Sequence, residues 1–198
     1  VASPYANVYA IGKSLNIRKL FHFTGVDSNT GLYTFQDIDH DGNVLYPNDL
    51  MTLKKIAQDY YGGFQNSFKY KKWEFDIFFQ FVKQTGHNYL SAVGAPGMFN
   101  SNEPKALLNR WQKPGDQAMA QKYTQDYSSS AYDAFSNAQY YGDNTISDAS
   151  YIRLKNLYLS YGLSIKTLAV LKIQSFRIFL QAQNVWTLTG YQGLDPEK

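Results

Sequence analysis

The residues of this sequence best suited to chemistry are the closely spaced carboxylates between positions 37 and 49. Acidic residues that alternate along the chain, followed by a glycine and an asparagine, reproduce the first positions of a calcium loop, in which hard oxygen atoms surround one cation. Position twelve of such a loop usually supplies a bidentate Glu. Here it is Asn48, and the carboxylate of Asp49 comes one residue later. The alternative is a solvated polar turn. The candidate Ca²⁺ ligands are Asp37, Asp39, Asp41, Asn43, Asn48 and Asp49.

The other titratable residues do not form a catalytic pattern. His22, His40 and His87 are far apart in the sequence, and none of them forms a His-x-x-x-His pair. Glu74 and Asp76 share one strand face, where we interpret them as polar lining rather than as an acid–base pair. No nucleophile elbow, phosphate loop or dinucleotide fingerprint occurs. We therefore expect no enzymatic activity and no required cofactor, with Ca²⁺ as the one ion that the sequence suggests.

Aromatic residues occur throughout the polar stretch 87–150, and Trp111 is the largest of them. Aromatic faces stack on sugar rings, and tyrosines are common at protein interfaces because they offer a large amphipathic area. Trp111 is therefore a candidate substrate-binding residue. The alternative is a loop that packs on its own aromatic side chains.

The composition excludes several classes of protein. The chain has 198 residues and no cysteine, which rules out a disulfide framework and cysteine-ligated metal sites. Its net charge is +3 and its basic residues are thinly spread, so it lacks the basic stripe of a nucleic-acid groove. No segment has the apolar length of a transmembrane helix. Aromatic residues make up 17% of the chain, which favours β-strands because large flat side chains suit a pleated surface.

Two segments, 61–86 and 151–187, alternate apolar and polar residues in the manner of β-hairpins. The clearest face runs from Trp73 to Phe81 and is uniformly large and apolar. It spans roughly 30 Å at about 3.3 Å per residue. Tilted, this length matches the lipid-facing band of about 25 Å in an outer-membrane barrel. The alternative is a soluble β-sandwich, whose strands average about five or six residues.

The fold class that we predict is all-β, with antiparallel strands that form part of a large transmembrane β-barrel. Four strands cannot close a barrel, because known barrels start at about eight. Outer-membrane barrels combine short periplasmic turns with long external loops, so we expect 71–72 and 165–174 to face the periplasm. Only Leu50–Ala57 shows apolar residues at helical spacing, over about two turns.

The predicted organisation follows the chain in five parts. These are an extracellular loop region with the candidate calcium loop at 1–60, a barrel hairpin at 61–86, a long extracellular loop at 87–150, a second barrel hairpin at 151–187, and the start of another extracellular loop at 188–198.

Five stretches together resemble one family over nearly the whole chain. They are Gly25–Gly31 with Asp37–Gly42, Tyr61–Phe68 with Tyr70-Lys71, Arg110–Asp116, Ser150–Asn156 with Leu159–Tyr161, and Gln183–Thr187 with Thr189–Glu197. In order and spacing they resemble the C-terminal part of SusC/RagA-type TonB-linked outer-membrane proteins. That family would continue into a further strand ending on an aromatic residue, whereas this sequence stops at Lys198.

The resemblance implies a transporter of the Gram-negative outer membrane that crosses it many times and contacts its lipid. It implies TonB-driven import of oligosaccharides or peptides, with a SusD-type surface lipoprotein as a lid. The plug domain, the segment that contacts the TonB complex and the rest of the barrel would lie upstream of Val1. Two other functions stay open: a soluble carbohydrate-binding β-sandwich module that uses a calcium loop, and a passive porin without a plug.

Overall fold

The computed structural model describes residues 5–98, 102–163 and 173–197. The chain divides into two compact units. The loop unit consists of Val1–Ala57, Thr85–Ser147 and Gln192–Leu194, and the sheet unit consists of Gln58–Gln84, Asp148–Tyr191 and Asp195–Lys198. Each unit is described by itself.

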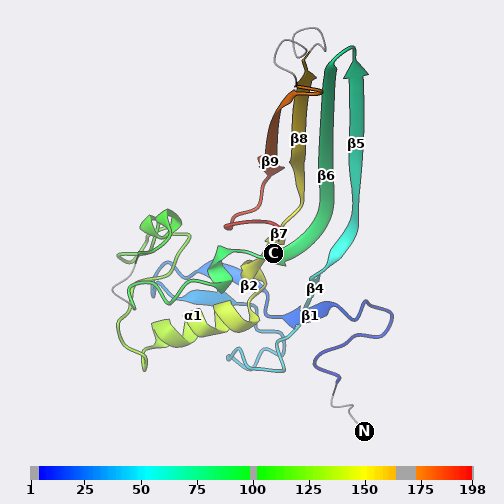
Figure 1. Cartoon of the computed structure of the whole chain (residues 1–198). Coiled ribbons are helices and arrows are strands. Elements are labelled where there is room, and N and C mark those ends of the chain that lie inside the picture. Colours follow the sequence, from blue (N-terminus) through cyan, green and yellow to red (C-terminus); the bar gives the residue numbers. More distant parts are fainter. Residues whose placement is uncertain (1–4, 99–101, 164–172, 198) are drawn as a thin grey trace. The chain divides into compact units, whose positions relative to one another are not determined.

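Four long antiparallel strands build the sheet unit, and Figure 1 shows them side by side in the order β5-β6-β8-β9. Their bounds are β5 Gln58–Tyr70, β6 Trp73–His87, β8 Tyr151–Gly162 and β9 Arg177–Thr189, and the short strand β7, Ile146–Asp148, pairs with β6. Lys71 and Lys72 form the two-residue turn between β5 and β6, where Lys71 adopts a left-handed φ of 55°. A turn this tight joins the strands in direct register, with Tyr70 opposite Trp73.

The register gives the sheet one apolar face, because side chains that are paired across strands point to the same side. Phe68, Phe75, Leu159 and Leu180 form one such row across all four strands. Between the Lys71-Lys72 turn and the row of Gly62 and Phe81, Gly62 and Asn66 are the two members without an apolar side chain. The apolar members are Phe64, Phe68, Tyr70, Trp73, Phe75, Ile77, Phe79, Phe81, Ile152, Leu154, Leu157, Leu159, Tyr161, Ile178, Leu180, Ala182, Trp186 and Leu188.

The opposite side of the sheet is the polar face. Its members are Tyr61, Gly63, Gln65, Ser67, Lys69, Glu74, Asp76, Phe78, Gln80, Val82, Tyr151, Arg153, Asn156, Tyr158, Ser160, Phe179, Gln181, Gln183, Thr187 and Thr189. Charged, amide and hydroxyl side chains of Ser and Thr together form the majority of this set, which also contains the aromatic residues Tyr61, Phe78, Tyr151, Tyr158 and Phe179. The predicted contrast between a uniformly apolar face and a mixed one is confirmed.

A β-bulge in the middle of β8 shifts which of its residues point to each face of the sheet. Phe78 pairs with Asn156 and Phe79 with Leu154, so Lys155 is an extra residue in the ladder. Leu154 and Leu157 consequently lie on the same face, although three positions separate them. For this reason the simple alternation in the sequence covers only the later half of the strand.

Strand boundaries differ slightly from the predicted hairpins. β5 begins before 61, β6 ends after 86, and β9 runs from Arg177 to Thr189 rather than ending at 187. The predicted connection 165–174 lies mostly outside the described residues.

The loop unit contains regular structure that the sequence did not predict. Strand β1, Ile17–Leu20, pairs with β4, Thr52–Lys55, and β2, Phe23–Val26, pairs with β3, Tyr33–Phe35. Within Leu50–Ala57, the one segment with apolar residues at helical spacing, the structure has strand β4 with alternating burial, in agreement with the predicted all-β class. In the stretch predicted as a long loop, the structure has the 3₁₀ turns η1 Tyr89–Ser91, η2 Lys105–Leu108 and η3 Asp143–Thr145, and the helix α1 Ser130–Tyr141.

Helix α1 supplies the core of the loop unit. The Ser129 side chain caps it by accepting a hydrogen bond from the Tyr132 backbone N–H. Ala131, Phe135 and Ala138, at helical spacing, are buried, and Phe135 and Ala138 pack with Tyr33 and Ala95. Burial raises the pKa of the Tyr33 phenol to about 12. In the described ranges, no helix has the length and apolar character that crossing a membrane would require.

Candidate functional site

The candidate calcium loop, residues 37–49, gathers three of its carboxylates. Asp37, Asp39 and Asp49 each offer an oxygen atom, and these atoms lie within 4.8 Å of one another. It is the one group of this kind found in the part of the chain that the structure describes. Three negative charges this close repel one another, and a bound divalent cation would offset the repulsion.

Backbone N–H groups hold the carboxylates in place. Asp37 accepts hydrogen bonds from His40 and Gly42, at 2.7 and 2.9 Å. Asp49 is almost completely buried and accepts from the Ile38 and Leu45 N–H groups at 2.7 and 2.8 Å. These donors hold the pKa of the Asp49 carboxyl below its ordinary value. The backbone donors therefore hold the Asp37 and Asp49 carboxyl groups in fixed positions.

The remaining predicted ligands have other partners. Asp41 is exposed and accepts from the Asn43 N–H at 2.7 Å. The Asn48 side chain donates its amide N–H to Asp39 at 3.3 Å. Asp49 takes the closing position although it comes one residue late, because the turn bonded from the Asp49 N–H to the Leu45 carbonyl carries it inward.

Trp111 is fixed by contacts within the loop unit. Its indole N–H donates to the Ser28 carbonyl at 2.8 Å, and its ring lies directly against Gly31. Gly31 has a φ of 72°, which favours glycine, and a side chain there would overlap the ring. The ring is partly exposed. Trp111 thus braces the turn that precedes the candidate calcium loop.

The polar face carries a hollow of about 330 Å³ at mid-height of the sheet. Its lining comes from Gln65, Asp76, Ile77, Phe78, Asn156 and Gln181. Three of these six residues carry a neutral amide, and one carries a carboxylate. The hollow can therefore offer hydrogen-bond donors and acceptors together.

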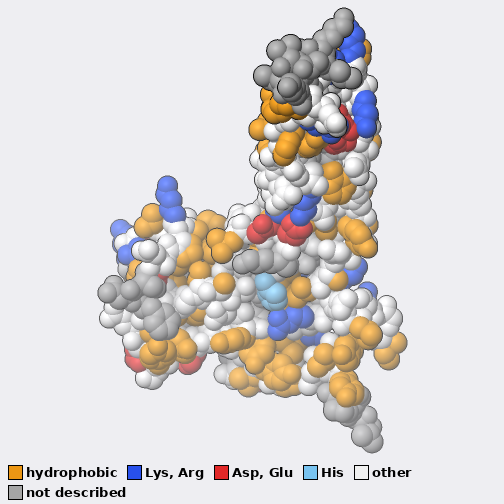
Figure 2. Space-filling view, viewed as in Figure 1, with side chains coloured by type: hydrophobic (Ala, Val, Ile, Leu, Met, Phe, Trp, Pro, Cys, Tyr) orange, Lys and Arg blue, Asp and Glu red, His pale blue; other side chains and the backbone are white. Residues whose placement is uncertain are grey.

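Arg153 forms an ion-pair cluster that sequence reasoning missed. Its guanidinium, on the polar face of β8, is almost completely buried and donates to Asp195 at 2.7 Å and to Glu197 at 2.5 Å. Lys155 also donates to Glu197, at 2.6 Å. Figure 2 shows acidic and basic side chains next to one another on the visible face of the sheet unit. The cluster ties the segment after β9 to the wall, and it holds the pKa of the Asp195 carboxyl below its ordinary value.

Both halves of that cluster stand in the stretches that carried the family resemblance, at 150–156 and 189–197. Nothing in the sequence indicates that they touch, because 42 residues separate Arg153 from Asp195. Only the pairing of β8 with β9 brings them together.

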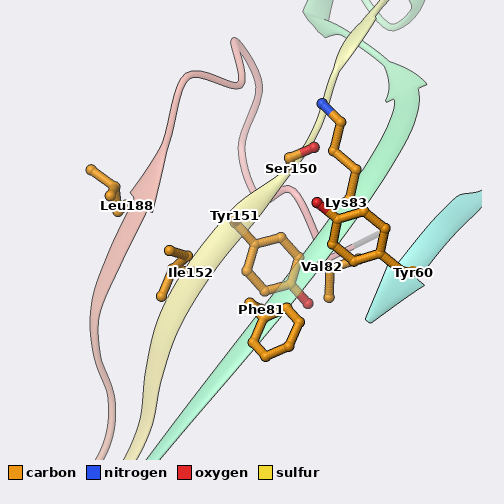
Figure 3. A pocket seen from close by; sticks show the side chains of 8 residues that line it. All are labelled: Tyr60, Phe81, Val82, Lys83, Ser150, Tyr151, Ile152 and Leu188. Carbon is orange, nitrogen blue, oxygen red and sulfur yellow. The ribbon is translucent and has the colours of Figure 1, made fainter. Parts of the chain in front are cut away.

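A second hollow, of about 480 Å³, lies at the end of the sheet away from the Lys71-Lys72 turn. Figure 3 shows side chains from four strands around it, among them Tyr60, Phe81, Ile152 and Leu188. Nearby, Lys83 donates to Asp148 at 2.6 Å. Apolar atoms dominate this hollow, and it continues the apolar face.

No protein-family profile matches the chain. The chain is 28% identical over 180 residues to the TonB-dependent receptor P3 of Formosa agariphila. The matched region covers 86% of the chain and 16% of that receptor. It is also 28% identical to the TonB-dependent receptor P39 of the same organism, over 82% of the chain and 15% of the receptor. The chain thus spans about a sixth of the length of these relatives.

Solved structures match the fold over most of the chain. The RagAB peptide importer in its open-open state superposes with a TM-score of 0.67 and 25% identity, covering 91% of this chain and 19% of that chain. The RagAB peptide transporter gives a TM-score of 0.66 and 26% identity, covering 91% and 20%. The solved structures and the TonB-dependent receptors indicate the same class of protein, and a sheet with one apolar and one polar face fits that class. The chain is part of a SusC/RagA-type TonB-linked outer-membrane protein.

In a SusC/RagA-type protein, one face of the sheet meets lipid and the other meets the lumen of the barrel. The four long strands are part of a transmembrane β-barrel wall, whose outward side chains meet lipid and whose inward side chains meet a polar lumen. The apolar face is therefore the lipid side. Tyr70, Trp73 and Tyr161 at its turn end fit the aromatic girdle that marks a membrane interface.

Proposed function

We propose that the whole protein imports oligosaccharides or peptides across the outer membrane of a Gram-negative bacterium, driven by TonB and assisted by a SusD-type surface lipoprotein. The observation that supports this most strongly is the wall itself: a single sheet with an apolar side and a polar side rich in amides and charges. The work is selective passage, and we expect no catalysis.

Peptides are the substrate class that the solved neighbours favour, since those proteins are a peptide importer and a peptide transporter. The polar face is compatible with this class because it offers amides, carboxylates and aromatic rings rather than one dominant charge. Oligosaccharides stay the second candidate class.

The soluble β-sandwich has less support than the transporter. A sandwich buries the apolar faces of two sheets against each other. In the described part of the sheet unit, large side chains of the apolar face stay exposed, including Phe68, Phe64 and Leu180 at 56–63%. Such a continuous apolar surface needs lipid or a partner to cover it.

We further propose a role for each part of the loop unit. It lies on the extracellular side, and Asp37, Asp39 and Asp49 hold a Ca²⁺ ion that fixes the loop 37–49. Trp111, which braces the turn at Ser28 and Gly31, binds substrate through the exposed part of its ring.

Deleting TonB tests the proposed import. Cells that carry the full-length protein are given a tryptic digest of casein, and the peptides that enter are quantified by mass spectrometry. We expect uptake to fall to the level of cells that lack the transporter. Uptake that persists without TonB would instead indicate a passive pore, and the proposal would be wrong.

A further inference from the structure

The middle of the polar face carries a group of amide side chains that no described residue engages. Gln65, Asn156, Gln181 and Gln183 are all exposed. None of the four makes a side-chain hydrogen bond within the ranges that the structure describes. Nearby, the Oε1 atom of Gln80 is buried and also lacks a hydrogen-bond partner there.

The register places these amides on a regular lattice. Gln65, Phe78, Asn156 and Gln183 form one row across the four strands. The next row, one step nearer the turn, contains Asp76 and Gln181. Gln181 and Gln183 stand two residues apart on β9, which is about 6.6 Å at 3.3 Å per residue. An extended peptide repeats its same-side groups at this interval, so successive groups of such a peptide can meet successive amides.

The chemistry of the lattice also suits a peptide. A side-chain amide carries a donor and an acceptor, as does each peptide group, so one Gln or Asn can satisfy both. Asp76, which accepts a hydrogen bond from the Ser67 hydroxyl, adds an acceptor for N–H groups. Phe78 and the stacked rings of Tyr158 and Phe179, with centroids 6.0 Å apart, offer apolar surface to side chains. The volume of the hollow, about 330 Å³, lies at the lower end of the range for ligand sites.

We infer that this amide group on the polar face is a contact site for an extended peptide during its passage through the lumen. The inference rests on the proposed function and deepens it, since it assigns peptide contacts to Gln65, Asn156 and Gln181. Neutral amides bind each peptide group weakly and without regard to sequence, which suits a solute that must also leave.

Neighbouring residues on opposite faces provide the test. In the full-length transporter, Gln65→Leu, Asn156→Leu and Gln181→Leu are combined, and Asn66→Leu is the matched control because Asn66 lies beside Gln65 on the apolar face. Uptake of the casein digest is measured below saturation. Since one hydrogen bond corresponds to about a five-fold change, we expect a loss on the order of a hundred-fold for the triple variant. The control should stay within about two-fold of the unaltered protein.

Folding is checked for each variant by the mobility of the unboiled protein on a gel. The single variant Gln181→Leu keeps the test decisive if the triple variant does not fold, and it should lose about five-fold. Equal uptake by the amide variants and by Asn66→Leu would overturn the inference. A TonB-dependent import of maltodextrins but not of peptides by the unaltered protein would overturn the peptide assignment. If the unaltered protein imports neither, the proposed function itself fails.

Discussion

Two neighbouring positions of β8 are expected to lose very different amounts of stability when a positive charge is added. Leu157 faces the lipid side at mid-height, in a row with Ile77 and Ala182, whereas Asn156 faces the lumen. Leu157→Arg places a charge near the bilayer midplane, where it costs about 2–4 kcal/mol. This corresponds to an approximately 30- to 900-fold loss in the folding equilibrium. Asn156→Arg leaves the charge in water and should change the free energy of unfolding by less than about 0.5 kcal/mol.

Depth within the membrane provides a second comparison. Ile178 lies on the same apolar face, in the row of Trp73 and Tyr161 at the turn end of the sheet. Because this row lies at the membrane interface, Ile178→Arg should cost only about 0–1 kcal/mol. The order of the three costs is therefore expected to be Leu157→Arg, then Ile178→Arg, then Asn156→Arg.

The assay is folding of the full-length protein into phospholipid vesicles over a urea series, with the folded fraction measured from gel mobility without boiling. Shifts of the urea midpoint give the relative costs. An equal shift for Asn156→Arg and Leu157→Arg would show that the two faces are not separated into lipid and lumen. A larger shift at Ile178 than at Leu157 would refute the assigned depth.

Further predictions concern the loops and the ion-pair cluster. Asp49→Asn should weaken Ca²⁺ binding, measured by calorimetry, at least about ten-fold more than Asp41→Asn does, because Asp49 belongs to the carboxylate group and Asp41 is exposed outside it. The pKa of Asp49 is lowered in the folded protein, so its stabilising contribution is complete above about pH 4 and is lost as the pH falls through the lowered value; protease digestion of the loop 37–49 should accelerate only in that acidic range, and acceleration between pH 5 and 7 would contradict this. Gly31→Ala should destabilise the loop unit by about 1–3 kcal/mol through overlap with Trp111, whereas Gly115→Ala, at a φ of 94° with open space around it, should show backbone strain alone; equal effects in thermal unfolding would exclude the overlap. Asp195→Asn combined with Glu197→Gln should cost about 3–5 kcal/mol because it leaves Arg153 buried without a counter-charge, and Arg153→Met should cost less in the same urea series because both carboxylates can regain water; the reverse order would disprove this account.

The faces of the wall could be predicted because strand geometry acts locally. In β6 every second residue from Trp73 to Phe81 is large and apolar, and no tertiary contact is needed to place such residues on one side. The phase change at Lys155 could not be predicted, since a bulge depends on the neighbouring strand. Helix α1 was missed because three of its buried residues, Ala131, Phe135 and Ala138, stand among polar residues and tyrosines.

In the candidate calcium loop, too, the sequence identified some of the residues and the fold decided the rest. Alternate carboxylates identified Asp37 and Asp39, while Asp49 stood one position late for the expected pattern. The turn that places Asp49 beside them depends on how the chain folds between Leu45 and Asp49.

The sequence by itself determined that this chain forms a two-faced wall of antiparallel strands, because a period of two residues necessarily divides side chains between two sides. Tertiary structure decided which distant residues meet: Trp111 with Ser28, Arg153 with Asp195, and Gln65 in one row with Asn156. Such contacts depend on strand register and chain reversal, which bring together groups that the order of residues keeps apart.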